Sequence, residues 1–448
     1  MRLARNVFAA VAAAMLVVSA TPSTTACPFC SAPSLTLSEQ LEQADAVVLA
    51  KWVAATPSKG QTGGTTTYEL VSVLKAVKET PAKKLDENVG TAEQAQVSAG
   101  SATNEGDEKT ADTKKPARVN LEPGEKITLV RFRAGKKGDQ FLLTGSGTDV
   151  IEWSSPLEVT DASYDYIAHL PKPSQPARER LAYFMKSLEH PEQLISNDAY
   201  GEFANAPYKE IAPTSDLMPR EQLRGWLTSA DTPSTRIGLY GLMLGLCGTS
   251  DDASLMEQQI LQPSEDFRLG IDGLMSGYLL LTGIEGLDRI DAWKLSAKYI
   301  LDVDGNPILD DKGEKTPLPF SETYSAMQAL RFMWTYAEGR IPKERLRESM
   351  RLLLDRPELA DLVIADLARW RDWSMQDRLM DLYGAEEYNI PSIKRAIVRY
   401  MLVGSKFKPK GKDDKPPAHV EKAKKNLDQL REQDPKTVSD AERFFFIN

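Results

Sequence analysis

Cysteine and histidine are scarce in this 448-residue chain, which contains three of each. Three cysteines cannot build a dense disulfide framework, so the domains must be held together by burial of apolar side chains. The histidines, His169, His190 and His419, lie far apart and form no paired-histidine motif. A zinc site also needs more donors than two thiols, so the sequence predicts no metal and no cofactor.

Long apolar runs are also missing beyond the N-terminal segment. The most apolar later stretch, 269–290, is interrupted by Asp272, Glu285 and Asp288, so it is not expected to span a membrane. The formal net charge of −9 argues against nucleic acid or an anionic membrane as the main partner. The length is too great for one hydrophobic core, so two or three domains are expected.

The first 26 residues have the pattern of a secretory signal peptide. Two arginines precede an apolar run at 7–18, which is too short to cross a bilayer stably. Small residues favour cleavage after Ala20 or after Ala26, so the protein is expected to be exported to the periplasm, the cell surface or the medium. Lipid attachment at Cys27 is an alternative, although a lipoprotein signal would normally carry Leu where Thr24 stands.

Two of the cysteines stand in the motif Cys27-Pro28-Phe29-Cys30. At this spacing they can form a local disulfide or act as a redox pair, because a thiolate at a helix N terminus attacks disulfides. A thioredoxin-like site follows a β-strand within a βαβ unit, whereas only the signal-like segment precedes this pair. We therefore predict a structural disulfide, with a redox pair as the alternative. The third cysteine, Cys247, lies in an apolar run and is predicted to be buried and inert.

Residues 27–170 are predicted to form a small β-barrel or sandwich of the OB-like kind. A short helix at 37–44 is followed by five runs rich in β-branched and aromatic residues, separated by Gly, Pro and Lys turn signals. These runs are 46–53, 65–77, 126–133, 139–144 and 149–160. The intervening stretch at about 78–118 is rich in Lys, Glu, Thr, Ala, Ser and Gly, so a disordered insertion is expected there.

A Pro-rich stretch at 171–176 marks a boundary, and a larger all-α array is predicted for 171–404 because apolar residues recur there at helical spacing. Within this region, 302–306 looks like a calcium loop, but Pro307 stands where the loop requires Gly. A β-hairpin inserted between helices is therefore expected instead. Residues 405–448 are predicted to be a Lys-rich linker and a C-terminal helical tail.

Two parts of the helical region share one pattern. Residues 234–245 are expected to form a helix, which a turn at 248–252 joins to a second helix at 255–261, and 357–382 has a similar arrangement. The pattern resembles HEAT-type repeats. The resemblance implies stacked helix pairs and a scaffold or binding role rather than a chemistry.

The front of the chain has a second pattern, in which two cysteines are followed by Pro33 and by the run 45–53 entering the β-domain. This order resembles the netrin-like, OB-related domains of metalloproteinase inhibitors. It departs from them in two ways. The spacing is Cys-x-x-Cys rather than Cys-x-Cys, and residues 31–170 contain no cysteine to form the long disulfides that those domains use. The resemblance implies a fold, and a protease-inhibitor-like β-domain is the second alternative function.

Seven glycines recur at three- and four-residue spacing in 238–248 and 270–277. Each costs about 1 kcal/mol of helix propensity relative to Ala, so something should offset them. Close approach of two helix backbones is the favoured explanation. A groove floor, on which a peptide or glycan lies against bare backbone, is the alternative.

The sequence identifies candidate binding residues but no catalytic ones. Arg369, Arg371 and Trp373 are predicted to contribute to a binding surface, because Trp and Arg are enriched at interface hot spots. Trp370 continues an apolar stripe and is expected in the core. The predicted function is that of an exported, non-enzymatic protein-binding or scaffold protein, whose partner is another protein or a cell-envelope component. A thiol-disulfide enzyme using Cys27 and Cys30 is the alternative.

Overall fold

The computed structural model describes residues 27–30, 35–58, 63–76, 121–147, 150–264, 267–407 and 415–443. The chain divides into two compact units, Ser34–Ala199 and a second unit that joins Cys27–Cys30 to the chain from Tyr200 onwards. The predicted signal peptide, the predicted insertion at 78–118 and part of the Lys-rich linker lie outside the described residues. No helix among the described residues is both long and apolar enough to cross a membrane.

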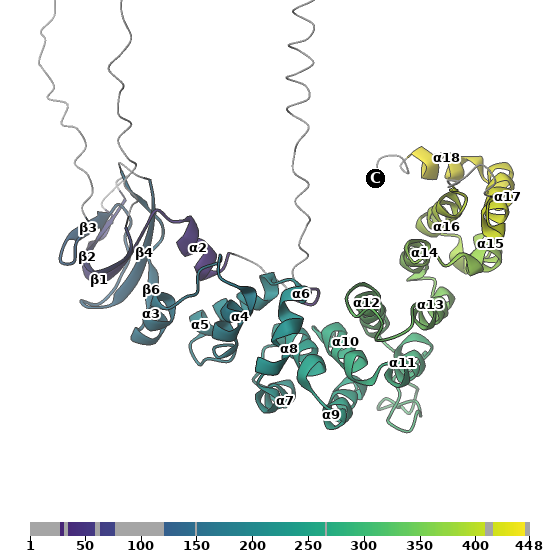
Figure 1. Cartoon of the computed structure of the whole chain (residues 1–448), viewed down its shortest axis with the longest axis horizontal. Helices are drawn as coiled ribbons and strands as arrows, with labels where there is room; N and C mark the ends of the chain where they lie inside the picture. Colours follow the sequence, from purple (N-terminus) through teal and green to yellow (C-terminus); the bar gives the residue numbers. More distant parts are fainter. Residues whose placement is uncertain are drawn as a thin grey trace, which may run out of the picture. The chain divides into compact units, whose positions relative to one another are not determined.

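The first unit contains an antiparallel β-sheet that curls into a nearly closed barrel (Figure 1). Its strands are β1 (Ala46–Thr56), β2 (Thr65–Lys75), β3 (Lys126–Leu129), β4 (Gln140–Ser146), β5 (Glu152–Trp153) and β6 (Leu157–Val159). Their order is β3-β2-β1-β4-β5, and β6 also pairs with β4. The run expected as one strand at 149–160 is two short strands, because Pro156 between them has no N–H for a sheet ladder.

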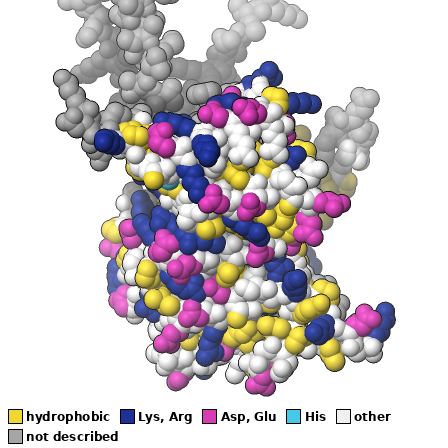
Figure 2. Space-filling model, turned by 90° about the vertical axis from the view of Figure 1, so that its right-hand side faces the viewer, with side chains coloured by type: hydrophobic (Ala, Val, Ile, Leu, Met, Phe, Trp, Pro, Cys, Tyr) yellow, Lys and Arg dark blue, Asp and Glu magenta, His cyan; other side chains and the backbone are white. Residues whose placement is uncertain are grey.

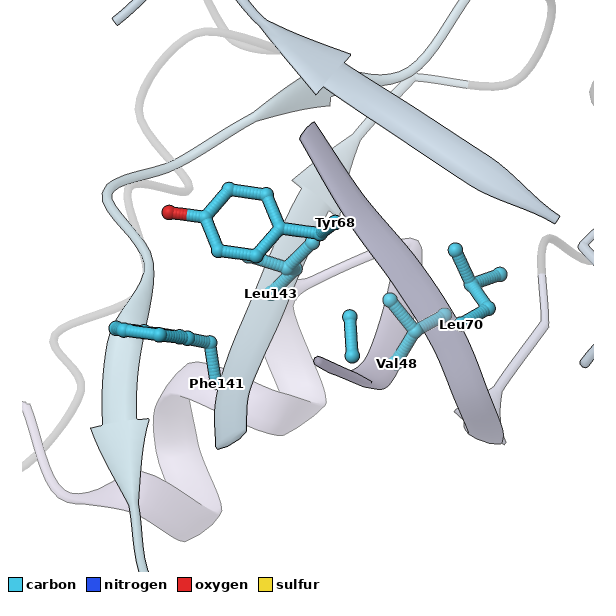
Figure 3. Packing of buried hydrophobic residues seen from close by; sticks show 6 residues of the cluster. Val48, Tyr68, Leu70, Phe141 and Leu143 are labelled. Atoms are coloured by element: carbon cyan, nitrogen blue, oxygen red, sulfur yellow. The ribbon is translucent and has the colours of Figure 1, made fainter. Parts of the chain in front are cut away.

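Alternate residues of the three central strands fill the barrel interior (Figure 3). The buried cluster consists of Val48 and Ala50 from β1, Tyr68 and Leu70 from β2, and Phe141 and Leu143 from β4. Members of each pair are two residues apart, because successive side chains of a strand point to opposite faces. The rings of Tyr68 and Phe141 meet edge to face with centroids 5.3 Å apart. Burying each large side chain contributes about 1.5–3 kcal/mol, so this cluster holds the strands together.

Side chains bridge the gap between the two ends of the sheet. Arg133, which follows β3, donates to the Pro156 carbonyl over 3.1 Å and pairs with Glu158 over 3.0 Å. Arg131 donates to the Ser155 hydroxyl. The arginine–glutamate pair is largely solvated and contributes little by itself, but together the contacts hold β3 beside the segment that joins β5 to β6.

Helices complete the first unit. These are α2 (Leu37–Gln43), α3 (Asp161–Ala168), α4 (Ala177–Met185) and the first part of α5 (Gln193–Asn205). The buried carboxylate of Asp198 in α5 accepts hydrogen bonds from the Leu37 N–H over 2.6 Å and from the Tyr166 hydroxyl over 2.8 Å. Asp198 therefore ties the start of α2 and the helix α3 to α5.

The second unit is a helical array (Figure 1). Its helices are α6 (Tyr208–Ile211), α7 (Arg220–Thr228), α8 (Ser234–Cys247), α9 (Ser250–Leu261), α10 (Ile271–Thr282), α11 (Ile284–Ile290), α12 (Phe320–Tyr336), α13 (Lys343–Leu352), α14 (Ala360–Arg369), α15 (Gln376–Tyr383), α16 (Pro391–Gly404), α17 (Ala418–Gln433) and α18 (Pro435–Arg443). Helices α8, α10 and α12 pack successively on one another, as do α14, α16 and α18, and odd-numbered helices pack on these neighbours. The predicted α+β fold class, a β-barrel followed by a larger helical array, is confirmed.

A small β-element interrupts the array between α11 and α12, as the sequence predicted. Backbone hydrogen bonds link Ile300, Ile308 and Thr316 in a ring: the N–H of each donates over 2.9 Å to the carbonyl of another. The turns between these three segments contain Gly305 and Gly313, whose φ angles are 82° and 81°. Glycine adopts such angles at little cost, which explains the Asp-Gly and Lys-Gly pairs in the sequence.

Candidate functional site

The N-terminal cysteines form a disulfide, and the loop that they close is seated on the second unit. We call Cys27–Cys30 the disulfide loop. The Cys27 N–H donates to the carbonyl of Ala204 in α5 over 3.0 Å, and the Cys30 N–H donates back to the Cys27 carbonyl over 3.3 Å. Cys27 is only 4% exposed, whereas Cys30 is partly exposed. The predicted disulfide is thus present, and its loop is anchored at one end by a backbone hydrogen bond.

Phe29 anchors the other side of the disulfide loop in a group of aromatic rings. Its ring centroid lies 5.0 Å from that of Phe332 in α12. The Phe332 ring in turn lies 5.1 Å from Tyr208 in α6 and 5.4 Å from Tyr336, one helical turn further along α12. We call Tyr208, Phe332 and Tyr336 the aromatic seat. Burial raises the pKa of Tyr208, so its phenol stays neutral and packs as an apolar ring.

The disulfide loop also rests on bare helix backbone. A Cβ placed on Gly238, in the first turns of α8, would lie 3.1 Å from both the Cβ and the carbonyl oxygen of Phe29. That separation is tighter than ordinary van der Waals contact, so a larger residue at 238 would push the loop away. Gly238 also lies against the backbone of Gly270 and Gly273 at the start of α10, so it takes part in the helix contact as well as in seating the loop.

Apart from Gly248, which lies against Leu244 and Asp252, the glycines of this pattern bring α8 and α10 together, as the favoured explanation predicted. A Cβ on Gly241 of α8 would lie 2.5 Å from the Cα of Leu274 in α10, and one on Gly245 would lie 2.3 Å from the Cα of Gly277. Neither neighbour is a flexible side chain that could move aside. The glycines therefore allow α8 and α10 to pack closer than any other residue would.

The predicted binding residues near 370 lie at the end of α14 and just after it. Arg369 is 73% exposed in its side chain and pairs with Asp366 over 3.1 Å. Arg371 is exposed and has a φ of 56°, the left-handed conformation that often ends a helix. Trp370 is buried, as predicted, and stacks on Trp334 with centroids 4.3 Å apart.

Trp373 is only partly exposed. Its ring stacks on His419 of α17, with centroids 5.7 Å apart and planes inclined by 14°, and meets Tyr400 of α16 edge-on at 5.2 Å. The sequence predicted a more exposed side chain for Trp373. The contact with α17 joins residues almost fifty positions apart, so no local pattern in the sequence indicates it. Arg369 and Arg371 therefore present more of their side chains to solvent than Trp373 does.

A buried charge network lies on another part of the array. Glu322 of α12 and Lys294 are 2% and 4% exposed, and Glu322 accepts from both Lys294 and Arg268 over 2.6 Å. Burial lowers the pKa of Lys294; for Glu322 the two cations outweigh burial, and its pKa is also lowered. Arg268 donates further to the carbonyls of Gln259 and Ile260. The buried charges of Glu322 and Lys294 are therefore paired, and the network joins α9 and α12.

The sequence could not indicate this network, because its members are separated by up to 54 residues. Lys294 lies in a π-helical turn (Asp291–Leu295), and its carbonyl accepts a hydrogen bond from Thr323 over 2.9 Å. Such turns often mark functional positions. Here each of the groups that could act as an acid or base is engaged in holding neighbouring elements together.

Asp252 forms a second buried ionic contact, next to Cys247. Burial favours its neutral form, but hydrogen bonds from Arg220, from the Thr249 N–H and from Arg224 outweigh that effect and lower its pKa to about 2. Burial raises the pKa of Cys247 to about 11, so little thiolate is present near neutral pH. Cys247 is partly rather than fully buried, and its raised pKa favours the unreactive thiol that the sequence predicted.

Two cavities lie away from these residues. One of about 520 Å³ in the first unit has an apolar wall that includes Leu41, Leu74 and Ile167. Lys75 also lines it, but its Nζ is engaged with the carbonyls of Leu41 and Glu42 at the end of α2. A cavity of about 440 Å³ lies against the β-element at 300–316. Among the described residues, no group of three His, Cys, Asp or Glu side chains is placed to hold a metal ion.

Comparison of the chain with protein-family models and with curated proteins found no match in either set.

Proposed function

We propose that this protein is an exported, non-enzymatic protein-binding or scaffold component of the periplasm or cell surface. The observation that supports the proposal most directly is the seating of the disulfide loop on the helical array. A backbone hydrogen bond to Ala204, aromatic contact with Phe332 and close approach to Gly238 together hold a short, non-helical peptide segment. These are the kinds of contact by which a protein surface recognises a peptide.

Two further observations support export and a protein partner. Disulfides persist in oxidising compartments outside the cytosol, which agrees with the signal-like N terminus. On the face shown in Figure 2, Lys and Arg side chains are interspersed with Asp and Glu side chains and with apolar ones. A nucleic-acid-binding face would carry a cluster of Lys and Arg side chains with few acidic ones. A mixture of both charges around apolar side chains suits a protein interface instead.

We also propose the two structural resemblances as working models. The succession of packed helices, in which α8 and α9 are joined by a short turn, supports a HEAT-like arrangement. The strand order β3-β2-β1-β4-β5 with a side-chain bridge between the sheet ends supports an OB-related barrel. Both models favour binding, because such folds usually present surfaces rather than chemistry.

Site-specific photocrosslinking in the producing cell tests the proposal. A photoreactive amino acid at position 371 sits on the exposed end of α14, and one at position 304 in the β-element serves as a matched exposed control. We expect one reproducible protein adduct from position 371 that is absent from position 304 and that decreases when Arg369 is replaced by Glu. If position 371 yields no reproducible adduct, or the same set as position 304, the proposed binding role of this surface is wrong.

An assay of disulfide reduction distinguishes the enzymatic alternative. The purified chain is incubated with a protein disulfide substrate and a dithiol reductant, and its turnover is compared with that of the Cys27→Ser variant. We expect both to match the uncatalysed rate, because all strand pairs among the described residues are antiparallel and the pair therefore lies in no βαβ unit of the thioredoxin kind. Catalysis that is lost in Cys27→Ser would establish the redox enzyme instead.

A further inference from the structure

The contacts that hold the disulfide loop all depend on the conformation of four residues. The Cys27 N–H reaches Ala204, and the Phe29 ring reaches Phe332, while the Phe29 backbone lies on Gly238. The disulfide keeps the ends of this segment together, so the hydrogen-bonding end and the aromatic end are presented as one pre-organised unit. Rigid segments bind more tightly because less conformational entropy is lost on docking.

We propose that the disulfide loop is a redox-operated strap over the aromatic seat: the oxidised loop covers the seat, and reduction releases the loop and exposes Tyr208, Phe332 and Tyr336. Release is a property of the isolated chain. The role of this release, which is to make the aromatic seat accessible to a partner protein, rests on the proposed function.

The chemistry requires an external dithiol. One of its thiolates attacks the sulfur of Cys30, which is the partly exposed cysteine, and the Cys27 sulfur leaves as a thiolate that takes up a proton. The second thiol of the reductant then attacks the mixed disulfide and frees Cys30. Two electrons and two protons pass to the loop, the reductant becomes a disulfide, and the loop carries two thiols.

Reduction changes the docking equilibrium because the opened segment gains conformational freedom mainly when it is undocked. For a loop of four residues, the chain-entropy description of disulfides gives a population of undocked loop that is roughly 20-fold larger after reduction. Phe29 supplies the aromatic contact with Phe332, so removing its ring should also undock the loop while the disulfide is intact.

Hydroxyl-radical footprinting of the full chain measures exposure of the seat. The oxidised protein is compared with protein that has been reduced with dithiothreitol and freed of reductant under nitrogen, and with the double variant Cys27→Ser, Cys30→Ser. We expect severalfold faster modification of Tyr208, Phe332 and Tyr336 in the reduced protein and in the double variant. Modification of Tyr400, which is buried far along the array beside Trp373, should stay constant.

Two variants keep the result interpretable. Phe29→Ala should expose the seat even in the oxidised protein, whereas Pro28→Ala, at an exposed position of the same loop, should leave the oxidised seat protected. Equal modification of the seat in oxidised and reduced protein would overturn the strap, and so would a parallel rise at Tyr400, since the unit would then loosen as a whole. Because no partner is present, this result is independent of the crosslinking at position 371.

Discussion

The packing of α8 against α10 gives a prediction whose sign can be worked out from the structure. Ala at position 241 would place its Cβ 2.5 Å from the Cα of Leu274, about 0.9 Å short of the 3.4 Å at which ordinary contact begins. The obstacle is backbone, so the two helices must separate. Overpacking of this kind costs about 1–3 kcal/mol, and a backbone obstacle places Gly241→Ala at the upper end of that range.

The same substitution gains helix propensity, which must be subtracted. Replacing Gly by Ala within a helix stabilises it by about 1 kcal/mol, so the net destabilisation of Gly241→Ala is about 2 kcal/mol. For a unit of this size, each kcal/mol shifts Tm by about 2–4 °C. We therefore expect the thermal transition of the helices, followed by far-ultraviolet circular dichroism, to fall by about 4–8 °C.

Gly225 provides a matched control with the opposite expected sign. It is an exposed glycine inside α7, and a Cβ there would meet nothing within 4 Å. Gly225→Ala should therefore keep the propensity gain and raise Tm by about 2–4 °C. If Gly241→Ala is neutral or stabilising like Gly225→Ala, the two helices are not in backbone contact and the explanation of the glycine pattern fails.

Three further predictions concern single residues. The pKa of Asp252 is lowered from 3.8 to about 2, so its carboxylate stabilises the fold at a pH above 3.8, and this contribution is lost as the pH falls towards 2. Asp252→Asn should therefore lower Tm at neutral pH and make Tm decrease less steeply as the pH falls. An acid profile of Tm that is unchanged from that of the original chain would contradict this. Cys247, whose pKa is raised to about 11, should react with iodoacetamide much more slowly in the native chain than in the unfolded one, and equal rates would disprove the inert thiol. Arg371→Gly should stabilise the chain by roughly 1 kcal/mol in a denaturant titration, because Gly adopts a φ of 56° without strain; a loss of stability would mean that the Arg371 side chain makes a stabilising contact.

Features with a local cause were predictable from the sequence. The helix before β1, the central strands and the β-element with its Asp-Gly turn follow from side-chain alternation and from the conformational freedom of glycine. The disulfide between Cys27 and Cys30 follows from their spacing and position. The close approach of α8 and α10 was also predictable, because helical glycines are costly unless packing offsets them.

Contacts between distant segments were not predictable in this way. Trp373 is covered by α17, and Glu322 is matched by Arg268 and Lys294, although no local pattern connects these positions. Each of these pairings depends on how successive helices stack, and stacking is decided by side-chain shape over the whole array. A single sequence shows which faces are apolar but not which face meets which.

The sequence by itself determined the order of a β-domain and a helical array, the disulfide and the glycine pattern, because each depends on residues near one another in the chain. Only the tertiary structure decided where the disulfide loop lies. Phe29 meets Phe332 across about three hundred residues of sequence, and such a contact forms only once α5, α6, α8 and α12 are in place. The aromatic seat is therefore a property of the folded array, and its residues carried no signal until the fold brought them together.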